Sequence, residues 1–100
     1  MNQMQQMLQN AQRMQRAMEK AHAELAKTEF SVSKNGMVEL VMLGNRSIQS
    51  LSIDADALDP ENKEMLEETI SLALNEALEK IQAAYDEIEE KIAGRSGVLF

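Results

Sequence analysis

Apolar residues recur every seven positions along the first quarter of the chain, and the pattern predicts a long helix over residues 2–27. One heptad position holds Met4, Ala11, Met18 and Leu25, and its companion holds Met7, Met14 and Ala21. A sustained heptad is typical of a helix that packs along another helix. No Gly or Pro interrupts the segment, and Asn2 can cap its start, with Gln5 three residues later.

The middle of the chain changes to short apolar runs separated by turn residues, which predicts strands over residues 29–34, 37–43 and 48–53. Asn35-Gly36 joins the first two strands and favours a type I′ hairpin, because both turn positions need a positive φ. Residues 44–47 form the second predicted turn. The middle strand is apolar on both faces apart from Glu39, so we expect helices or another subunit to cover both of its sides.

A second long helix is predicted over residues 60–93. Asp59 is a good capping residue, and Pro60 suits the first helical position because no N–H partner is needed there. Gly94 is a natural stop. Apolar residues step by four and three along one side of this helix, at Leu66, Ile70, Leu74, Ala77, Ile81, Ala84, Ile88 and Ile92.

The predicted order is α-β-β-β-α, an α+β fold in which two long helices flank a three-stranded antiparallel sheet and a short tail follows over 94–100. A chain of 100 residues suffices for one domain, 1–100, and not for two. Each helix spans roughly 40 Å, whereas strands of this length reach only ~20 Å. The helices must project past the sheet with apolar stripes exposed, which predicts a homodimer. Whether the first helix packs on its own second helix or on the partner's stays open.

The chain is acidic overall, with a formal charge of −7, but its two halves differ. Residues 1–50 hold six Lys or Arg against four Asp or Glu, and residues 51–100 hold four against thirteen. There is no cysteine, which excludes disulfides and thiolate chemistry and fits a reducing cytoplasm. No apolar stretch is long enough to span a bilayer, and no basic segment precedes an apolar run at the start, so we expect neither a membrane anchor nor a signal peptide.

The candidate binding residues are four cations on the first helix, Arg13, Arg16, Lys20 and Lys27. Their heptad positions place them opposite the apolar seam, and Arg13 and Lys27 lie ~21 Å apart along the helix. Such a stripe can follow DNA phosphates and gain affinity by counterion release. The alternative is an ordinary solvated face, with Arg16–Glu19 and Lys20–Glu24 as surface pairs.

Other polar residues give no catalytic or metal-binding constellation, and no cofactor is expected. Lys91 and Arg95 suit the carboxyl end of the second helix, where cations complement the helix dipole, with contact to DNA as the alternative. The nearby carboxylates of residues 86, 87, 89 and 90 favour a solvated face, because no His or Cys joins them. His22, the only histidine, flanks the heptad seam and is expected to pack there. The eight methionines favour a dimer core, or a protein-docking groove as the alternative.

Residues 53–77 resemble the most characteristic stretch of the YbaB/EbfC family of bacterial nucleoid-associated proteins. The resemblance rests on Ile53-Asp54, Leu58, Asn62-Lys63-Glu64-Met65-Leu66-Glu67-Glu68 and Ala73-Leu74-Asn75-Glu76-Ala77. The Met- and Gln-rich opening helix and the three central strands are also similar, so nearly the whole chain is covered. The end, Gly94-Arg-Ser-Gly-Val-Leu-Phe100, departs from the Gly/Met/Pro-rich tail of many members.

The resemblance implies a tweezer-like homodimer that binds duplex DNA with little sequence preference through its projecting helices. It implies a place in the nucleoid, in the bacterial cytoplasm, and a role in nucleoid organisation or gene expression. The alternative is a scaffold for proteins of DNA replication or repair, which the acidic second half and the Met-rich helix favour. A holdase similar in outline to prefoldin subunits is a third hypothesis, although residues 53–77 do not resemble prefoldin. No enzyme and no small-molecule substrate are expected.

Overall fold

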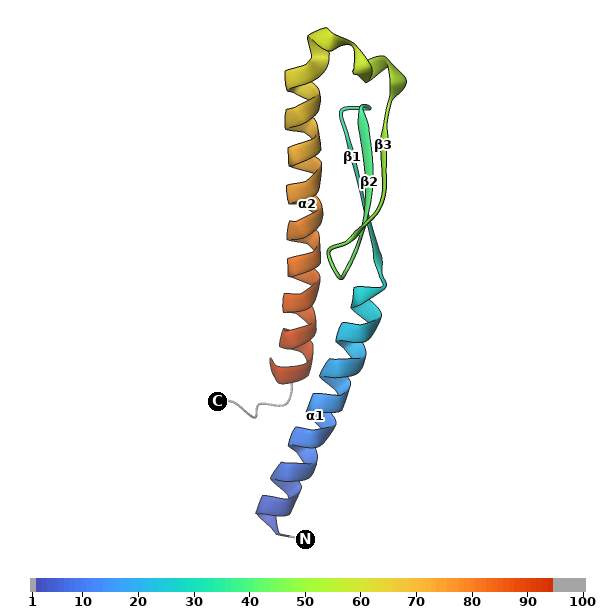
Figure 1. The fold of residues 1–100 in the computed structure, drawn as a ribbon. Coiled ribbons are helices and arrows are strands. Elements are labelled where there is room, and N and C mark those ends of the chain that lie inside the picture. Colours follow the sequence, from blue (N-terminus) through green and yellow to red (C-terminus); the bar gives the residue numbers. More distant parts are fainter. Residues whose placement is uncertain (1, 95–100) are drawn as a thin grey trace.

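The computed structural model describes residues 2–94 and shows an elongated molecule measuring 71 × 23 × 14 Å along its principal axes. The α-β-β-β-α order and the antiparallel sheet predicted from the sequence are confirmed (Figure 1). Two short 3₁₀ segments lead from the sheet into the second long helix, and that helix ends in a short π-helical stretch. The elements are α1 (Gln3–Ala26), β1 (Glu29–Lys34), β2 (Val38–Leu43), β3 (Ile48–Ile53), η1 (Ala55–Leu58), η2 (Pro60–Asn62), α2 (Lys63–Glu89) and η3 (Glu90–Gly94).

The sheet has the strand order β1-β2-β3, with both neighbouring pairs antiparallel. Asn35 and Gly36 both adopt positive φ, 55° and 65°, which confirms the type I′ turn expected between the first two strands. Met37 lies in this turn, where its N–H donates to the Lys34 carbonyl, so β2 begins one residue later than predicted. The register pairs Val32 with Leu40, and these side chains therefore share one face of the sheet.

The core lies between that face and α2, which packs mainly on β1 and β2. The buried apolar residues of this cluster are Val32, Val38, Leu40, Met42, Ala73, Ala77 and Ile81. Thr69 is also buried, at 2% exposure, and accepts a hydrogen bond from the side-chain amide of Asn35. Small side chains at positions 69, 73 and 77 let the helix backbone approach the sheet closely.

The apolar stripe predicted for α2 is rotated from the one observed. Ala77 and Ile81 are buried as expected, but Leu66, Ile70 and Leu74 are only partly buried and pack at the margin of the core. The centre of the contact is instead occupied by Thr69 and Ala73. The sequence pattern favoured the largest apolar residues, whereas close packing on a sheet selects small ones.

The start of α2 also differs from the prediction. Asp59 accepts a hydrogen bond from the Glu61 N–H and Pro60 is the first helical residue, but this cap opens the short 3₁₀ segment η2. The regular α-helix begins at Lys63. At the other helix, Asn2 caps α1 as predicted, since its side chain accepts from the Gln5 N–H at 2.8 Å.

The carboxyl end of α1 is fastened to the rest of the molecule through the turn between β2 and β3. The Gly44 N–H donates to the Thr28 carbonyl, and a Cβ added at Gly44 would collide with the backbone carbonyl of Leu25. The phenol of Tyr85 in α2 donates to the Gly44 carbonyl at 3.1 Å. We call Leu25, Gly44 and Tyr85, with the surrounding His22 and Arg46, the α1 anchor.

One face of the sheet remains uncovered within the chain. Glu39 is exposed on that face, and Val41 and Leu43 beside it are partly buried. No described helix packs there, so the expected cover on both sides of β2 is not provided by α2 alone. Within residues 2–94, no helix is both long enough and apolar enough to cross a membrane.

Candidate nucleic-acid interface

The amino-terminal part of α1 projects beyond all other described elements (Figure 1). From residue 14 onward the heptad side of α1 meets α2 and η3, and Met14, Met18 and Ala21 are partly buried. Residues 3–13 are all exposed. We call this segment the α1 arm. The heptad therefore predicted the helix–helix contact correctly for the carboxyl half of α1, while Met4 and Met7 remain 70% and 69% exposed.

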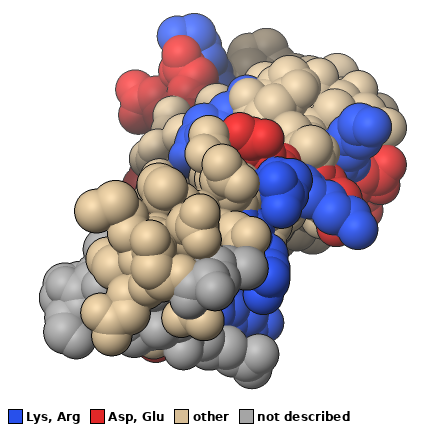
Figure 2. Space-filling view, turned by 90° about the horizontal axis from the view of Figure 1, so that it is seen from below, with Lys and Arg blue, Asp and Glu red and all other residues tan. Residues whose placement is uncertain are grey.

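The four candidate cations lie on the side of α1 that faces away from α2. Arg13, Arg16, Lys20 and Lys27 lie along this side, and we call them the basic face. Arg13, Arg16 and Lys20 belong to the regular helix, and Lys27 is its capping residue. Seen from below along α1, blue side chains gather on one side of the helix, behind described residues of the tip that have no charged side chain (Figure 2). The spacing of three, four and seven residues keeps all four on one strip of helix surface.

The basic face has no internal partners among the described residues. The surface pairs weighed from the sequence, Arg16–Glu19 and Lys20–Glu24, do not occur among the ion pairs of residues 2–94. Glu19 instead accepts a hydrogen bond from the side chain of Gln15 at 3.3 Å. The positive charge of the basic face is therefore available to a ligand.

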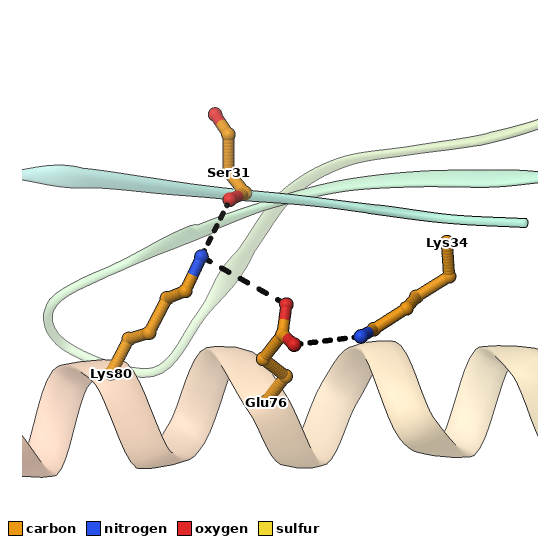
Figure 3. A network of polar contacts seen from close by, with 4 residues as sticks. All are labelled: Ser31, Lys34, Glu76 and Lys80. Carbon is orange, nitrogen blue, oxygen red and sulfur yellow. Dashed lines mark hydrogen bonds and ion pairs between the residues drawn. The ribbon is translucent and has the colours of Figure 1, made fainter. Parts of the chain in front are cut away.

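The other described cations are already engaged. Lys34 and Lys80 both contact Glu76, at 2.7 and 3.9 Å, and Lys80 also donates to the Ser31 carbonyl (Figure 3). The hydrogen bond from Lys34 lowers the pKa of Glu76 from its ordinary value of 4.5, so the carboxylate stays ionised to a lower pH than a free glutamate does.

Three further cations have partners of their own. Lys63 pairs with Glu67, and Lys91 pairs with Glu87 at 2.9 Å. Arg46 donates to the side chain of Gln82 and lies over the Tyr85 ring, 5.1 Å from its centroid. Among the residues that the structure describes, the cations without such a contact are the four of the basic face.

The remaining candidate residues take structural positions. His22 is partly buried and meets the Tyr85 ring edge-on, with the centroids 5.3 Å apart, as expected for a residue beside the seam. Arg95 lies outside the described residues. Within residues 2–94, no group of three His, Cys, Asp or Glu side chains is placed to hold a metal ion.

Sequence reasoning missed one surface, which lies beside α2 on the inner face of the sheet. The β3 residues Ile48 and Leu51 are 51% and 44% exposed, although Leu51 pairs with the buried Leu40. Ile53 at the end of β3 is partly buried, and on the neighbouring flank of α2 Leu78 is 37% exposed while Ile70 and Leu74 are partly buried. We call these six residues the β3 apolar surface. Apolar residues at 48, 51 and 53 were visible in the sequence, but nothing there showed that α2 would leave them uncovered.

The sequence is similar to those of known proteins over most of its length. The model of the YbaB/EbfC DNA-binding family matches residues 1–96. A nucleoid-associated protein of Metamycoplasma arthritidis is 41% identical over 90 residues, which cover 90% of this chain and 94% of that protein. A nucleoid-associated protein of Chloroflexus aurantiacus is 37% identical over 96 residues, with 95% and 96% covered.

These names describe nucleoid-associated and DNA-binding proteins and not enzymes. Both relatives are similar to this chain over nearly the full length of either protein, and the family match includes both long helices and the whole sheet. The chain belongs to the YbaB/EbfC DNA-binding family.

Proposed function

We propose that this protein binds duplex DNA as a homodimer, with the basic face of α1 as the contact surface in each subunit. One observation carries the proposal: Arg13, Arg16, Lys20 and Lys27 have no ion-pair partner among the described residues, while the other described cations are engaged. Binding of this kind takes place in the nucleoid, in the bacterial cytoplasm, and acts on nucleoid organisation or gene expression.

The opposing factor is the overall charge. Two copies together carry −14, twice the formal charge of −7, so long-range attraction to DNA is absent. At physiological salt, however, charges more than ~8–10 Å apart are largely screened. Binding then depends on the local face, where each phosphate contact releases a counterion. Because the contacts are to phosphates, sequence preference is small and the expected Kd lies at roughly 10⁻⁴–10⁻⁶ M at physiological salt.

Fluorescence anisotropy tests this directly. A short labelled duplex is titrated with the protein at low and at physiological salt. We expect saturable binding whose affinity falls steeply as salt rises. A folded sample that gives no binding at about 100 μM protein and low salt contradicts the proposal. Non-specific binding to DNA typically has a Kd of roughly 10⁻⁴–10⁻⁶ M at physiological salt, and it is tighter at low salt.

The homodimer is supported by the β3 apolar surface. Part of the inner face of the sheet lacks a cover because α2 lies over β1 and β2. Specific dimers bury about 800 Å² on each partner, with an apolar centre. A second copy presenting the same six residues would cover this surface symmetrically, as the two-fold arrangement of most homodimers requires.

Leu51→Glu is therefore expected to convert the dimer to a monomer, because the variant places a charge in the centre of the β3 apolar surface. Light scattering coupled to size exclusion measures the mass. Ser50→Glu is the matched control, since the neighbouring residue points to the opposite face of the same strand and should leave the dimer intact. A dimeric Leu51→Glu protein, or a monomeric Ser50→Glu protein, would place the interface elsewhere.

A protein-interaction scaffold is the second candidate function. The observation that favours it is an apolar groove on the α1 arm, lined by Gln3, Met4, Met7, Leu8 and Ala11. Methionine side chains adapt readily to different partners. If the duplex titration gives no binding and a replication or repair protein is retained by the purified chain after nuclease treatment, the scaffold replaces the DNA-binding function.

A further inference from the structure

The surface of the α1 arm continues the basic face with uncharged amides. Gln9 lies four residues before Arg13 and seven before Arg16, and Gln6 lies seven before Arg13. At 3.6 residues per turn these spacings bring both glutamines onto the same strip of helix as the cations. Both glutamines are exposed, and their side chains make no hydrogen bond with any described residue.

The electrostatic setting differs along this strip. Glu24 lies between Lys20 and Lys27 on the same side of the helix, so the carboxyl part of the basic face carries a carboxylate that repels phosphate. Glu19 is the first acidic residue of the chain, and the only charged side chains before it are those of Arg13 and Arg16. A duplex therefore meets the least repulsion at the amino-terminal part of α1.

Steric access for a duplex is also greatest at the amino-terminal part of α1. The α1 arm has no neighbour among the described elements, whereas α2 and the turn between β2 and β3 flank the helix further along. From Gln6 to Lys27 the strip is roughly 32 Å long, close to one turn of B-DNA. Side-chain amides suit such a contact, because Gln can donate to phosphate oxygens and can pair with the edge of adenine in the major groove.

We propose that Gln6 and Gln9 extend the DNA-contacting face beyond its cations and hydrogen-bond the duplex as neutral groups. The inference rests on the proposed function, since it assigns two further residues to the same surface. A neutral contact adds affinity but releases no counterion from the DNA. Loss of the two amides should therefore lower the affinity and leave its salt dependence unchanged, whereas loss of a cation should change both.

The test compares two double variants with the wild type by fluorescence anisotropy over a range of salt concentrations. The first is Gln6→Ala with Gln9→Ala. We expect the affinity to fall roughly 5- to 30-fold at every salt concentration, with the wild-type slope of log affinity against log salt. Arg13→Gln should instead make that slope shallower by about two, because it removes one phosphate-neutralising cation from each subunit of the dimer.

The matched control is Gln3→Ala with Asn10→Ala. These two amides also lie on the α1 arm, seven residues apart, but roughly 100° around the helix from the basic face. Gln3 lines the apolar groove beside Met4. Alanine favours helix at all four positions, so both variants should keep the helical circular dichroism of the wild type. The control should bind within about 2-fold of the wild type, well inside the expected fall in affinity.

Three results would overturn the inference, and they are distinguishable. If the wild type binds and the two double variants bind alike, the amides are solvated surface residues and only this inference fails. If the wild type does not bind at low salt, the proposed function fails and the inference fails with it. A change of salt slope in the Gln6, Gln9 variant would also contradict the inference, because it would show that a cation, and not a neutral group, had left the phosphates.

Discussion

Reversing Arg13, Arg16 and Lys20 together to Glu should weaken duplex binding by at least about 100-fold at low salt. The change removes three cations per chain and places three carboxylates against the phosphates. The four cations of the basic face share one strip of α1, so Lys27 alone cannot hold the duplex in register. The same anisotropy titration measures the fall in affinity, and circular dichroism confirms that the helices persist.

A second variant with the same net charge distinguishes the effect of the basic face from the effect of net charge. Reversing Lys63, Lys80 and Lys91 to Glu also makes the formal charge of −7 more negative by the same amount, but these three side chains lie on α2 and η3 and already contact carboxylates. At physiological salt we expect this protein to bind within about 5-fold of the wild type, because charges beyond a Debye length of ~8 Å are then screened. An equal fall in affinity in both variants would mean that overall repulsion, and not the basic face, governs binding.

Gly44→Ala is expected to lower the free energy of unfolding by about 2 kcal/mol or more, since overpacking in tight sites typically costs about 1–3 kcal/mol. The added Cβ would meet the backbone carbonyl of Leu25, which cannot rotate away as a side chain can. The backbone movement that relieves this collision also disturbs the hydrogen bond from Tyr85 to the Gly44 carbonyl. Urea unfolding at a fixed protein concentration measures the change.

Gly94→Ala provides the control for this substitution. A Cβ at Gly94 would lie 3.7 Å from the Glu90 Cγ, an ordinary van der Waals distance, so stability should change by less than about 0.5 kcal/mol. Amide exchange adds a local measurement, since Gly44→Ala should speed exchange near Leu25 and Thr28. Unchanged stability and exchange in Gly44→Ala would show that the α1 anchor is looser than the structure indicates.

The architecture could be predicted from the sequence because its signals are local. The heptad of α1, the Asn35-Gly36 turn and the Asn2 cap each depend on a few neighbouring residues, and the structure confirms the helix, the turn and the cap. The contact between α2 and the sheet depends on how closely two backbones approach. Periodicity of large apolar residues does not report that distance, so Thr69 and Ala73 were missed.

The candidate site could also be predicted only in part from the sequence. Periodicity placed Arg13, Arg16, Lys20 and Lys27 on one side of a helix, and the structure leaves that side free of ion pairs within the described part of the chain. The sequence could not show whether neighbouring carboxylates neutralise these cations, because ion pairing depends on side-chain geometry. It also could not show that Lys34 and Lys80, far apart in the sequence, would share Glu76.

Only the carboxyl half of α1 is held by neighbouring elements, because the α1 anchor fixes its end and the helix packs against α2 and η3 from residue 14 onward. The α1 arm extends for ~16 Å beyond these contacts. A bend of about 5° at the last contact would move the tip of the arm sideways by ~1.4 Å. Two such arms in a dimer would together adjust the opening between them by ~3 Å to duplexes of different groove width or curvature. A protein built this way gains some tolerance for the shape of its DNA from a short unsupported segment at the end of a fixed helix.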